Sequence, residues 1–317
     1  MRRHLTGKVA WLTAITVVVG GMLAANASAE PSMGPLPVQF DFRDAVLGLL
    51  APETPPPGAN DWNCLPTPEH PHPVVLVNGT GLGMGNDWRA GAPFLKNNGF
   101  CVYTFNTGTP SWLPNGTPVY TLGDVTEQAR DLAIMVDRVR AATGAAKVDV
   151  VGHSSGGGLV SLYYLNRLDG TEFVDKMIGI SPSNHGTSLS TIVSLGRSLA
   201  PGAYNALGAA FPSLTQQALD SDIVEEIYGA GDTRPGVTYT TIVTRYDQTV
   251  TPYENQYLDG PRVTNITLQD GCPIDRSEHL STLYNERVWR HVLNALDPDH
   301  PAPVPCIPVD PYWPGIR

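Results

Sequence analysis

The sequence is poor in charge and has no long run of Lys or Arg. Only 16% of its 317 residues are charged, the formal net charge is −10, and the pI is about 5.2. Proteins bind nucleic acids largely through clustered basic residues, so this composition argues against a nucleic-acid partner. A neutral or apolar substrate is more consistent with it.

The sequence also lacks the common cofactor and metal motifs. It contains no GxGxxG or P-loop pattern, which argues against nucleotide binding. It contains no CxxC pair and no paired-His spacing, which argues against zinc. We therefore expect neither a cofactor nor a metal.

Cysteine is scarce, with four residues in the chain. Four cysteines allow three pairings, and local order favours Cys64 with Cys101 and Cys272 with Cys306. Each bridge would close a loop of tens of residues and contribute about 3–4 kcal/mol in the chain-entropy model. Paired cysteines indicate an oxidising compartment.

Residues 1–29 have the pattern of a secretion signal peptide. Arg2, Arg3 and Lys8 precede an apolar run, and the small residues ASA stand at 27–29. The run is short and contains glycines and threonines, which favours a cleaved signal over a retained membrane anchor. Cleavage would remove three cations and change the formal charge from −10 to −13. We expect a secreted protein without an integral membrane segment after cleavage; the sequence does not decide between general export and the twin-arginine route.

The rest of the chain alternates short β-branched runs with helical patterns. With 42% hydrophobic residues it can bury one large core. The alternation predicts an α/β fold with a mostly parallel central sheet and helices on both faces. We expect strands at residues 73–77, 101–105, 147–151, 176–180, 238–244 and 262–268, and long helices at 122–143 and 280–296.

These elements predict a single domain over residues 30–317. Its first part, 30–73, is rich in proline and is expected to wrap the surface. The stretch at about 183–236 is unusually long for a connection between strands, so we expect a small helical cap there.

The stretch KVDVVGHSSGGGLV, residues 147–160, contains the most specific motif. Gly152-His153-Ser154-Ser155-Gly156 matches G-x-S-x-G between a predicted strand and a predicted helix. Glycines two before and two after the serine permit a sharp turn that bulkier residues would block. We interpret Ser154 as a nucleophile; the alternative is a turn whose glycines serve only packing.

A serine hydroxyl needs a base to take its proton and a carboxylate to orient that base. In this kind of fold the chain order is serine, acid, histidine. The downstream histidines are His185, His279, His291 and His300. His185 follows the very next strand and is expected to shape the substrate cleft. His291 lies within a helical pattern, and His300 lies in a tail segment flanked by prolines. His279, in the loop that opens the last helix, is the predicted base.

The acid is expected after the strand that precedes the histidine loop. Asp247 stands two residues beyond the segment YTTIVTR. Asp270 and Asp275 are the alternatives, but both follow the last strand and would crowd the loop of the base. The predicted catalytic triad is Ser154, Asp247 and His279.

Attack on a carbonyl creates an oxyanion that needs two backbone donors. The residue after the nucleophile, Ser155, supplies one, and Thr80 in the glycine-rich segment VVLVNGTGLGMG is predicted to supply the other. The alternative is an ordinary glycine-rich turn. Three apolar residues beside Thr80 are candidates for the substrate pocket or for the core: Leu82, Met84 and Trp88.

Six segments, in this order, resemble the secreted class 2 lipases of actinobacteria. They are PVVLVNGTG, FCVYTFNTG, VDVVGHSSGG, ISPSNHGTSL, TIVTRYDQTVTPY and VTNITLQDGCPIDRSEHL. The first and third also resemble the small fungal lipase B type. The resemblance covers residues 61–298 and implies an α/β-hydrolase fold.

The resemblance also implies roles for individual residues. Ser154, Asp247 and His279 match the nucleophile, acid and base, Thr80 and Ser155 match the oxyanion positions, and the cysteines match the two local disulfides. One departure is Asn78 (VNGTG), where bacterial lipases usually carry a histidine. It leaves the backbone donors in place but makes the fine geometry of that loop an open question.

We therefore expect a secreted serine ester hydrolase. It would be a lipase that hydrolyses acylglycerols through an acyl-enzyme on Ser154. Its partner would be a lipid or other ester, and it would act at an oil–water interface. The alternatives are a polyester or cutin-type esterase, an acyltransferase of the same fold, and a hydrolase-fold binding protein. A monomer is expected. The cap segment carries apolar residues that suit either an acyl pocket or a core helix: Leu189, Ile192, Val193, Leu199 and Phe211.

Overall fold

The computed structural model describes residues 35–189 and 198–311. Leu36–Arg317 is assigned to a unit separate from Met1–Pro35, and every element below belongs to this second unit. The predicted signal peptide, residues 1–29, lies outside the described residues.

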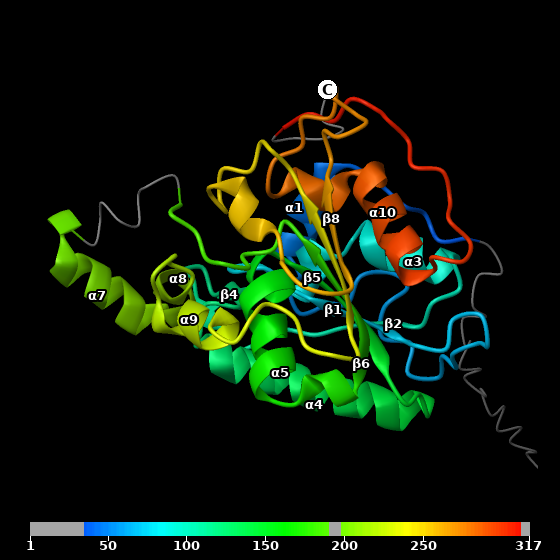
Figure 1. Cartoon of the computed structure of the whole chain (residues 1–317), viewed down its shortest axis with the longest axis horizontal. Helices are drawn as coiled ribbons and strands as arrows, with labels where there is room; N and C mark the ends of the chain where they lie inside the picture. The colour runs from blue at the N-terminus through cyan, green and yellow to red at the C-terminus, as the bar shows by residue number, and fades with distance from the viewer. Residues whose placement is uncertain (1–34, 190–197, 312–317) are drawn as a thin grey trace, which may run out of the picture. The chain divides into compact units, whose positions relative to one another are not determined.

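A six-stranded sheet with the order β2-β1-β5-β6-β7-β8 forms the centre of the second unit (Figure 1). Every neighbouring pair is parallel. Strands β1, β2 and β5 are buried along their whole length, as expected for a parallel sheet covered on both faces. The predicted parallel sheet is confirmed. Its strands are β1 (Val74–Val77), β2 (Val102–Thr104), β5 (Val148–His153), β6 (Val174–Ile180), β7 (Thr238–Val243) and β8 (Val263–Thr267).

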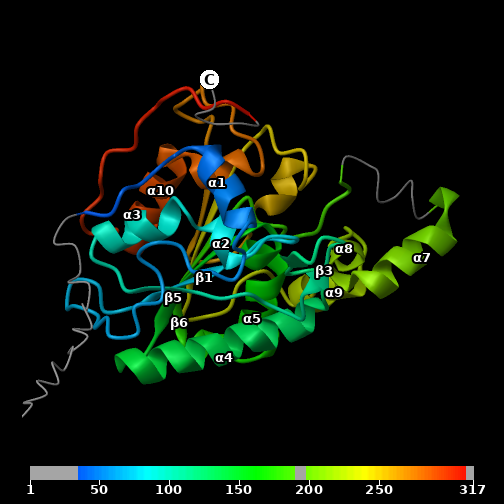
Figure 2. The same cartoon turned by 180° about the vertical axis from the view of Figure 1, so that it is seen from behind.

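Helices cover both faces of this sheet (Figures 1 and 2). One layer consists of α4 (Val125–Thr143), α5 (Ser161–Arg167) and α9 (Asp222–Tyr228). The other consists of α1 (Phe42–Leu49), α3 (Gly91–Asn97) and α10 (Glu286–Leu296). Successive strand residues point to opposite faces, so Val150 packs in the first layer and Val151 in the second.

Local sequence explains where the long helix α4 begins and ends. The Asp124 side chain accepts hydrogen bonds from the N–H groups of Thr126 and Glu127, which caps the first turn. Gly144, at φ 71°, adopts the left-handed conformation that ends the helix. The helix therefore begins three residues later than the predicted 122–143.

The last predicted helix, residues 280–296, is split in the structure. A 3-10 turn, η4 (Ser281–Tyr284), precedes α10. Asn285 separates them, because its extended backbone leaves the helix and its side chain accepts from the Arg287 N–H.

The long connection between β6 and β7 has two different parts. Helices α7 (Pro201–Ala210) and α8 (Pro212–Gln216) come first, and α7 extends away from the sheet in both views (Figures 1 and 2). Helix α9 instead packs its Ile223 and Ile227 into the core layer with α5. Ile192 and Val193 lie outside the described residues.

Several short elements were not anticipated from the sequence. They are α1, α2 (Met84–Asp87), the antiparallel hairpin of β3 (Ser111–Trp112) and β4 (Pro118–Val119), and the 3-10 turns η2 (Gly170–Glu172) and η3 (Tyr253–Gln256). Such short segments give little periodic signal, because none of them is longer than the eight residues of α1.

Two disulfides tie distant segments together, Cys64–Cys101 and Cys272–Cys306, the pairs that local order favoured. Across residues 35–189 and 198–311, no helix combines the length and the apolar character needed to span a bilayer.

Candidate active site

Ser154 occupies a strained turn directly after β5. Its φ is 53°, in the left-handed region that non-glycine residues rarely adopt. The turn is followed at once by the π-helix η1 (Gly156–Val160), so strand, turn and helix succeed one another without a spacer. This geometry directs the serine side chain beyond the carboxyl end of the sheet.

The flanking glycines are required by close backbone contacts. A Cβ on Gly156 would lie 2.3 Å from the carbonyl oxygens of Val77 and Asn78, and a Cβ on Gly152 would lie 2.4 Å from the Gly156 oxygen. Both distances are shorter than any non-bonded contact allows. The motif therefore does pack tightly, and the packing is what produces the turn at Ser154.

His279 and Asp247 form a buried pair. Asp247 follows β7, His279 lies in the loop between β8 and η4, and His279 Nδ1 is 2.8 Å from Asp247 Oδ2. Asp247 is also fixed by other donors: its Oδ1 accepts from the N–H groups of Thr249 and Val250, both at 2.8 Å, and its Oδ2 accepts from Gln256 Nε2 at 2.9 Å. The carboxylate thus has a single orientation toward the imidazole.

The pair shifts the pKa of each partner. Burial lowers the pKa of His279, but the charge of Asp247 and its hydrogen bond outweigh burial, and the pKa lies above its usual value of 6.5. Burial raises the pKa of Asp247, but the charge and hydrogen bond of His279, together with the two backbone donors, hold it below 3.8. Asp247 is therefore ionised at neutral pH, ready to stabilise a protonated imidazole.

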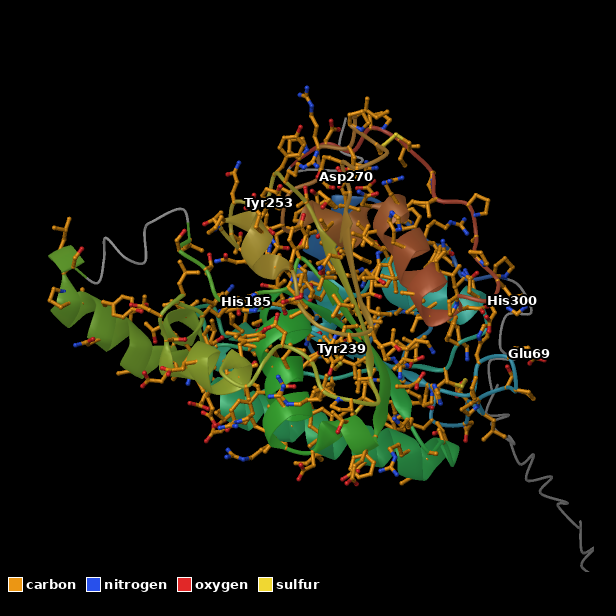
Figure 3. The ribbon with its side chains drawn as sticks, viewed as in Figure 1. Glu69, His185, Tyr239, Tyr253, Asp270 and His300 are labelled. Carbon is orange, nitrogen blue, oxygen red and sulfur yellow. A yellow bond between two sulfur atoms is a disulfide. The ribbon has the colours of Figure 1, made fainter. Side chains whose placement is uncertain are left out.

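The alternative acids lie elsewhere. Asp270 is exposed, pairs with Arg245 Nη2 at 2.5 Å, and lies at the upper edge of the view in Figure 3. Asp275 is buried, but it binds the Ser277 hydroxyl at 2.6 Å and the Asn285 amide at 2.7 Å. Both brace the loop that leads to the base.

The alternative histidines also have other partners. His185, expected in the substrate cleft, lies outside the cavity described below; its Nε2 pairs with Asp232 Oδ1 at 3.1 Å and its ring packs on Tyr228. The Asn255 oxygen, 3.0 Å from His185 Nδ1, also holds this ring, and a part in shaping the cleft stays a prediction. His291 lies within α10, where burial lowers its pKa to about 4. His300 is exposed at the right-hand margin of Figure 3.

Thr80 and Ser155 meet beside the nucleophile. The Thr80 hydroxyl donates to Ser155 Oγ at 2.8 Å and accepts from Gln217 Nε2 at 2.8 Å. Gln217 directly follows α8, so a residue of the cap region fixes the Thr80 side chain. Gln217 was not predicted from the sequence, because no local pattern marks a glutamine whose partner lies 137 positions away.

Asn78, the departure from the lipase pattern, anchors the same loop. Its Nδ2 donates to the Phe105 oxygen at 2.8 Å, and its Oδ1 accepts from Trp88 Nε1 at 2.6 Å. Fully buried, it therefore connects the end of β1 to the chain after β2 and to α2.

An apolar cavity of about 590 Å³ opens at these loops. Thr80, Ser154 and His279 line one part of it. Of the residues left open between pocket and core, Leu82 lines it, whereas Trp88 is fully buried against Trp289. The apolar lining comes from Leu82, Leu189, Ala203, Leu207, Leu214 and Leu280, mostly of the cap region.

A second His–carboxylate group lies far from this cavity. His72, Asp149 and Asp175 bring their ligand atoms within 4.8 Å of one another, an arrangement that can hold a metal and that the sequence analysis did not anticipate. The Lys176 ammonium already lies 3.1 Å from Asp175 Oδ2 and 3.7 Å from Asp149 Oδ2. Asp149 is five residues before Ser154 on β5, roughly 16 Å away at about 3.3 Å per residue, so this group cannot serve the serine.

Comparisons with known proteins agree with this architecture. Residues 73–212 match the family model described as the alpha/beta hydrolase fold. Among curated proteins, none matches the sequence. With six parallel strands between two helix layers, the chain has the α/β-hydrolase fold, as predicted.

Two solved structures are similar to the chain. Lipase B of Aspergillus fumigatus has 25% sequence identity and a TM-score of 0.59, and the match covers 79% of this chain. This chain spans only 57% of the length of that lipase. The mature form of the Bacillus licheniformis lipase BlEst2 has 17% identity and a TM-score of 0.53, with 77% of this chain and 96% of that chain covered.

Proposed function

We propose that this α/β-hydrolase-fold chain is a secreted serine ester hydrolase, specifically a lipase that cleaves acylglycerols. One observation carries the proposal: the strained Ser154 opens into the same apolar cavity as His279, whose Nδ1 is bound to Asp247. A nucleophile and a base that line one cavity, with an acid bound to the far side of the base, are the parts that ester hydrolysis requires.

The reaction follows from these positions. Ser154 Oγ attacks the ester carbonyl while its proton passes to His279 Nε2, the nitrogen not bound to Asp247. The oxyanion accepts hydrogen bonds from the N–H groups of Thr80 and Ser155. The C–O bond then breaks, the leaving alcohol takes the proton from His279, and an acyl group remains on Ser154. Water, deprotonated by His279, then attacks that acyl group. The bond between the acyl carbon and Ser154 Oγ breaks, Oγ takes the proton back from His279, and the carboxylic acid leaves.

Gln217 gives the Thr80 hydroxyl a second role in this scheme. Because the Gln217 amide donates to Thr80 Oγ1, the hydroxyl hydrogen is free to point elsewhere, and at rest it points to Ser155 Oγ. In the tetrahedral intermediate it turns to the oxyanion as a third donor. The cap region thereby contributes to charge stabilisation.

The lining of the cavity supports a fatty acyl substrate. Its mostly apolar side chains offer a surface for an alkyl chain. Both similar structures described above carry the name lipase. The two disulfides support an oxidising, extracellular location. We propose a monomer related to the actinobacterial class 2 lipases.

The test is labelling of the oxidised protein with a fluorophosphonate probe. We expect one adduct on Ser154, and we expect Ser154→Ala to lose both the adduct and turnover while its Tm stays within a few degrees of wild type. Absence of any adduct on Ser154 in folded wild-type protein would favour a binding protein and refute the proposed function.

A second measurement decides among esterases. Rates on p-nitrophenyl esters and on triacylglycerol emulsions are compared from short to long acyl chains. A lipase retains activity on long-chain emulsions. Activity confined to soluble short esters would contradict the lipase assignment, and transfer to an alcohol in preference to water would indicate an acyltransferase.

A further inference from the structure

The triad leaves unexplained a second buried acid–histidine pair next to it. Asp87 is the last residue of α2 and His153 is the last residue of β5, directly before Ser154. Both side chains are 0% exposed, and His153 Nδ1 lies 3.3 Å from Asp87 Oδ1. Burying two polar groups this completely is unfavourable unless each of them interacts with the other or with a third polar group.

Each member of the pair holds a different catalytic loop. Asp87 Oδ2 accepts a hydrogen bond of 2.7 Å from the N–H of Gly79, the residue before Thr80. His153 Nε2 lies 3.2 Å from the backbone oxygen of His279. The pair therefore joins the oxyanion loop, the nucleophile turn and the loop of the base, three segments that are far apart in the sequence.

The contacts also indicate which atoms carry protons. The His279 oxygen can only accept, so His153 Nε2 donates to it. His153 Nδ1 and Asp87 Oδ1 face each other at 3.3 Å, and neither atom has another hydrogen-bond partner among the described residues. The two side chains are therefore committed to each other and to the loops that they contact.

The surroundings hold the pair in one position. A Cβ on Gly79 would lie 2.7 Å from His153 Nδ1, so the loop before Thr80 lies directly against the ring. The rings of His153 and His279 have centroids 4.9 Å apart. Helix α2 is fixed from outside, because the Tyr284 hydroxyl donates to the Asn86 oxygen at 2.5 Å. A shift of either residue would therefore move the groups that surround the substrate carbonyl.

We propose that Asp87 and His153 are positioning residues that set the distance between the oxyanion donors, Ser154 and His279. The proposal rests on the function proposed above. Catalysis depends on such distances, and a misplacement of about 1 Å can lower a rate by about 100-fold.

The experiment compares Asp87→Asn and Asp87→Ala with wild type. The asparagine keeps an oxygen for the Gly79 N–H but removes the charge, whereas alanine removes both. With a soluble p-nitrophenyl ester we expect kcat to fall about 10-fold for Asp87→Asn and about 100-fold for Asp87→Ala, with KM nearly unchanged. Fluorophosphonate labelling of Ser154 should slow in the same order.

A pH profile separates positioning from simple structural support. Burial lowers the pKa of His279, whereas Asp247, Glu278 and, to the smallest extent, Asp87 raise it. Both variants remove the Asp87 charge, so they should move the inflection of kcat/KM slightly to lower pH. A variant that loses only stability would not move it. If Asp87→Ala does not fold, Asp87→Asn decides by the same two readouts.

Asp149→Asn is the matched control. Like Asp87, Asp149 is a buried carboxylate with a histidine partner, here His72, and it lies on β5 itself. It lies at the opposite end of the strand and should alter Tm without changing kcat or the pH inflection. Wild-type kinetics and labelling in folded Asp87 variants would overturn the positioning role alone. Wild-type protein without an adduct on Ser154 would overturn the proposed function together with it.

Discussion

Ser154 has a strained backbone, with a φ of 53°, at the position of the proposed nucleophile. A left-handed serine costs on the order of 1–2 kcal/mol relative to a relaxed conformation. The structure tolerates this conformation because neighbouring backbone atoms lie directly against Gly152 and Gly156 and hold the turn in one path. The strain turns the side chain toward the cavity shared with His279.

At Asp247 we predict a loss of rate together with a shift in pH dependence. Only the neutral imidazole of His279 accepts the Ser154 proton, so kcat/KM should rise with pH through a pKa above 6.5. Asp247→Asn removes the largest of the influences that raise this pKa, and burial, which lowers it, then weighs more. We expect kcat to fall by about 10⁴-fold and the inflection to move to lower pH, measured as a pH–rate profile on a soluble ester.

Asp270→Asn is the control for that measurement. Asp270 is an exposed acid that pairs with Arg245, so its replacement should leave both kcat and the inflection unchanged. A large loss of rate in Asp270→Asn, with near-normal Asp247→Asn, would mean that the acid is misassigned.

Thr80 tests the side-chain donor. Thr80→Val keeps the shape and the backbone N–H but removes the hydroxyl bound to Ser155 and Gln217. Loss of one oxyanion donor typically costs about 10²–10³ in kcat, and we expect a loss at the lower end because two backbone donors remain. Steady-state kinetics of Thr80→Val and Thr80→Ser provide the check: serine, which retains a hydroxyl, should recover most of the rate, and equal rates in all three proteins would exclude the hydroxyl from the reaction.

At the scale of elements, the junction of β5 and η1 depends on its glycines. In Gly156→Ala the new methyl group would meet the ends of β1 at 2.3 Å, and these are backbone atoms that cannot turn aside. We expect a destabilisation of about 1–3 kcal/mol and loss of esterase activity, because the turn must widen. Urea denaturation together with ester turnover measures both effects.

Gly123→Ala is the matched substitution, since nothing lies within 4 Å of the Cβ that it would add. Stability and activity of this variant should remain close to wild type. If Gly156→Ala were equally harmless, the close packing of the turn would not be what positions Ser154.

For the whole molecule, the disulfides are expected to matter for stability and not for chemistry. Cys64–Cys101 joins residues 37 positions apart, and the chain-entropy model gives about 4 kcal/mol for a loop of that length. The double variant Cys64→Ala with Cys101→Ala should lose about that much free energy of unfolding in urea while keeping kcat at 25 °C. A loss below about 1 kcal/mol would contradict the entropic account for this bridge.

Local sequence patterns predicted the parts of the fold that depend on residues close together in the chain. The apolar runs at β1 and β5 predicted buried strands, and G-x-S-x-G predicted the turn, because both signals lie within a few positions. The structure then brought Asp247 and His279 into contact, 32 positions apart, at the carboxyl ends of their strands. Gln217 and Asp87 gave no signal, because their contacts arise only when separate loops meet.

By itself, the sequence determined the order of the six sheet strands and of the longest helix, the turn around Ser154 and the residue types available for catalysis, since hydrophobic periodicity and glycine geometry act over short stretches of chain. Only the tertiary structure decided how the β6–β7 connection divides between cap and core. It also decided that Gln217 reaches Thr80 and that Asp87 and His153 join three loops. The physical reason is that these contacts depend on the register and layering of the parallel sheet, which places loop ends side by side regardless of their distance along the chain.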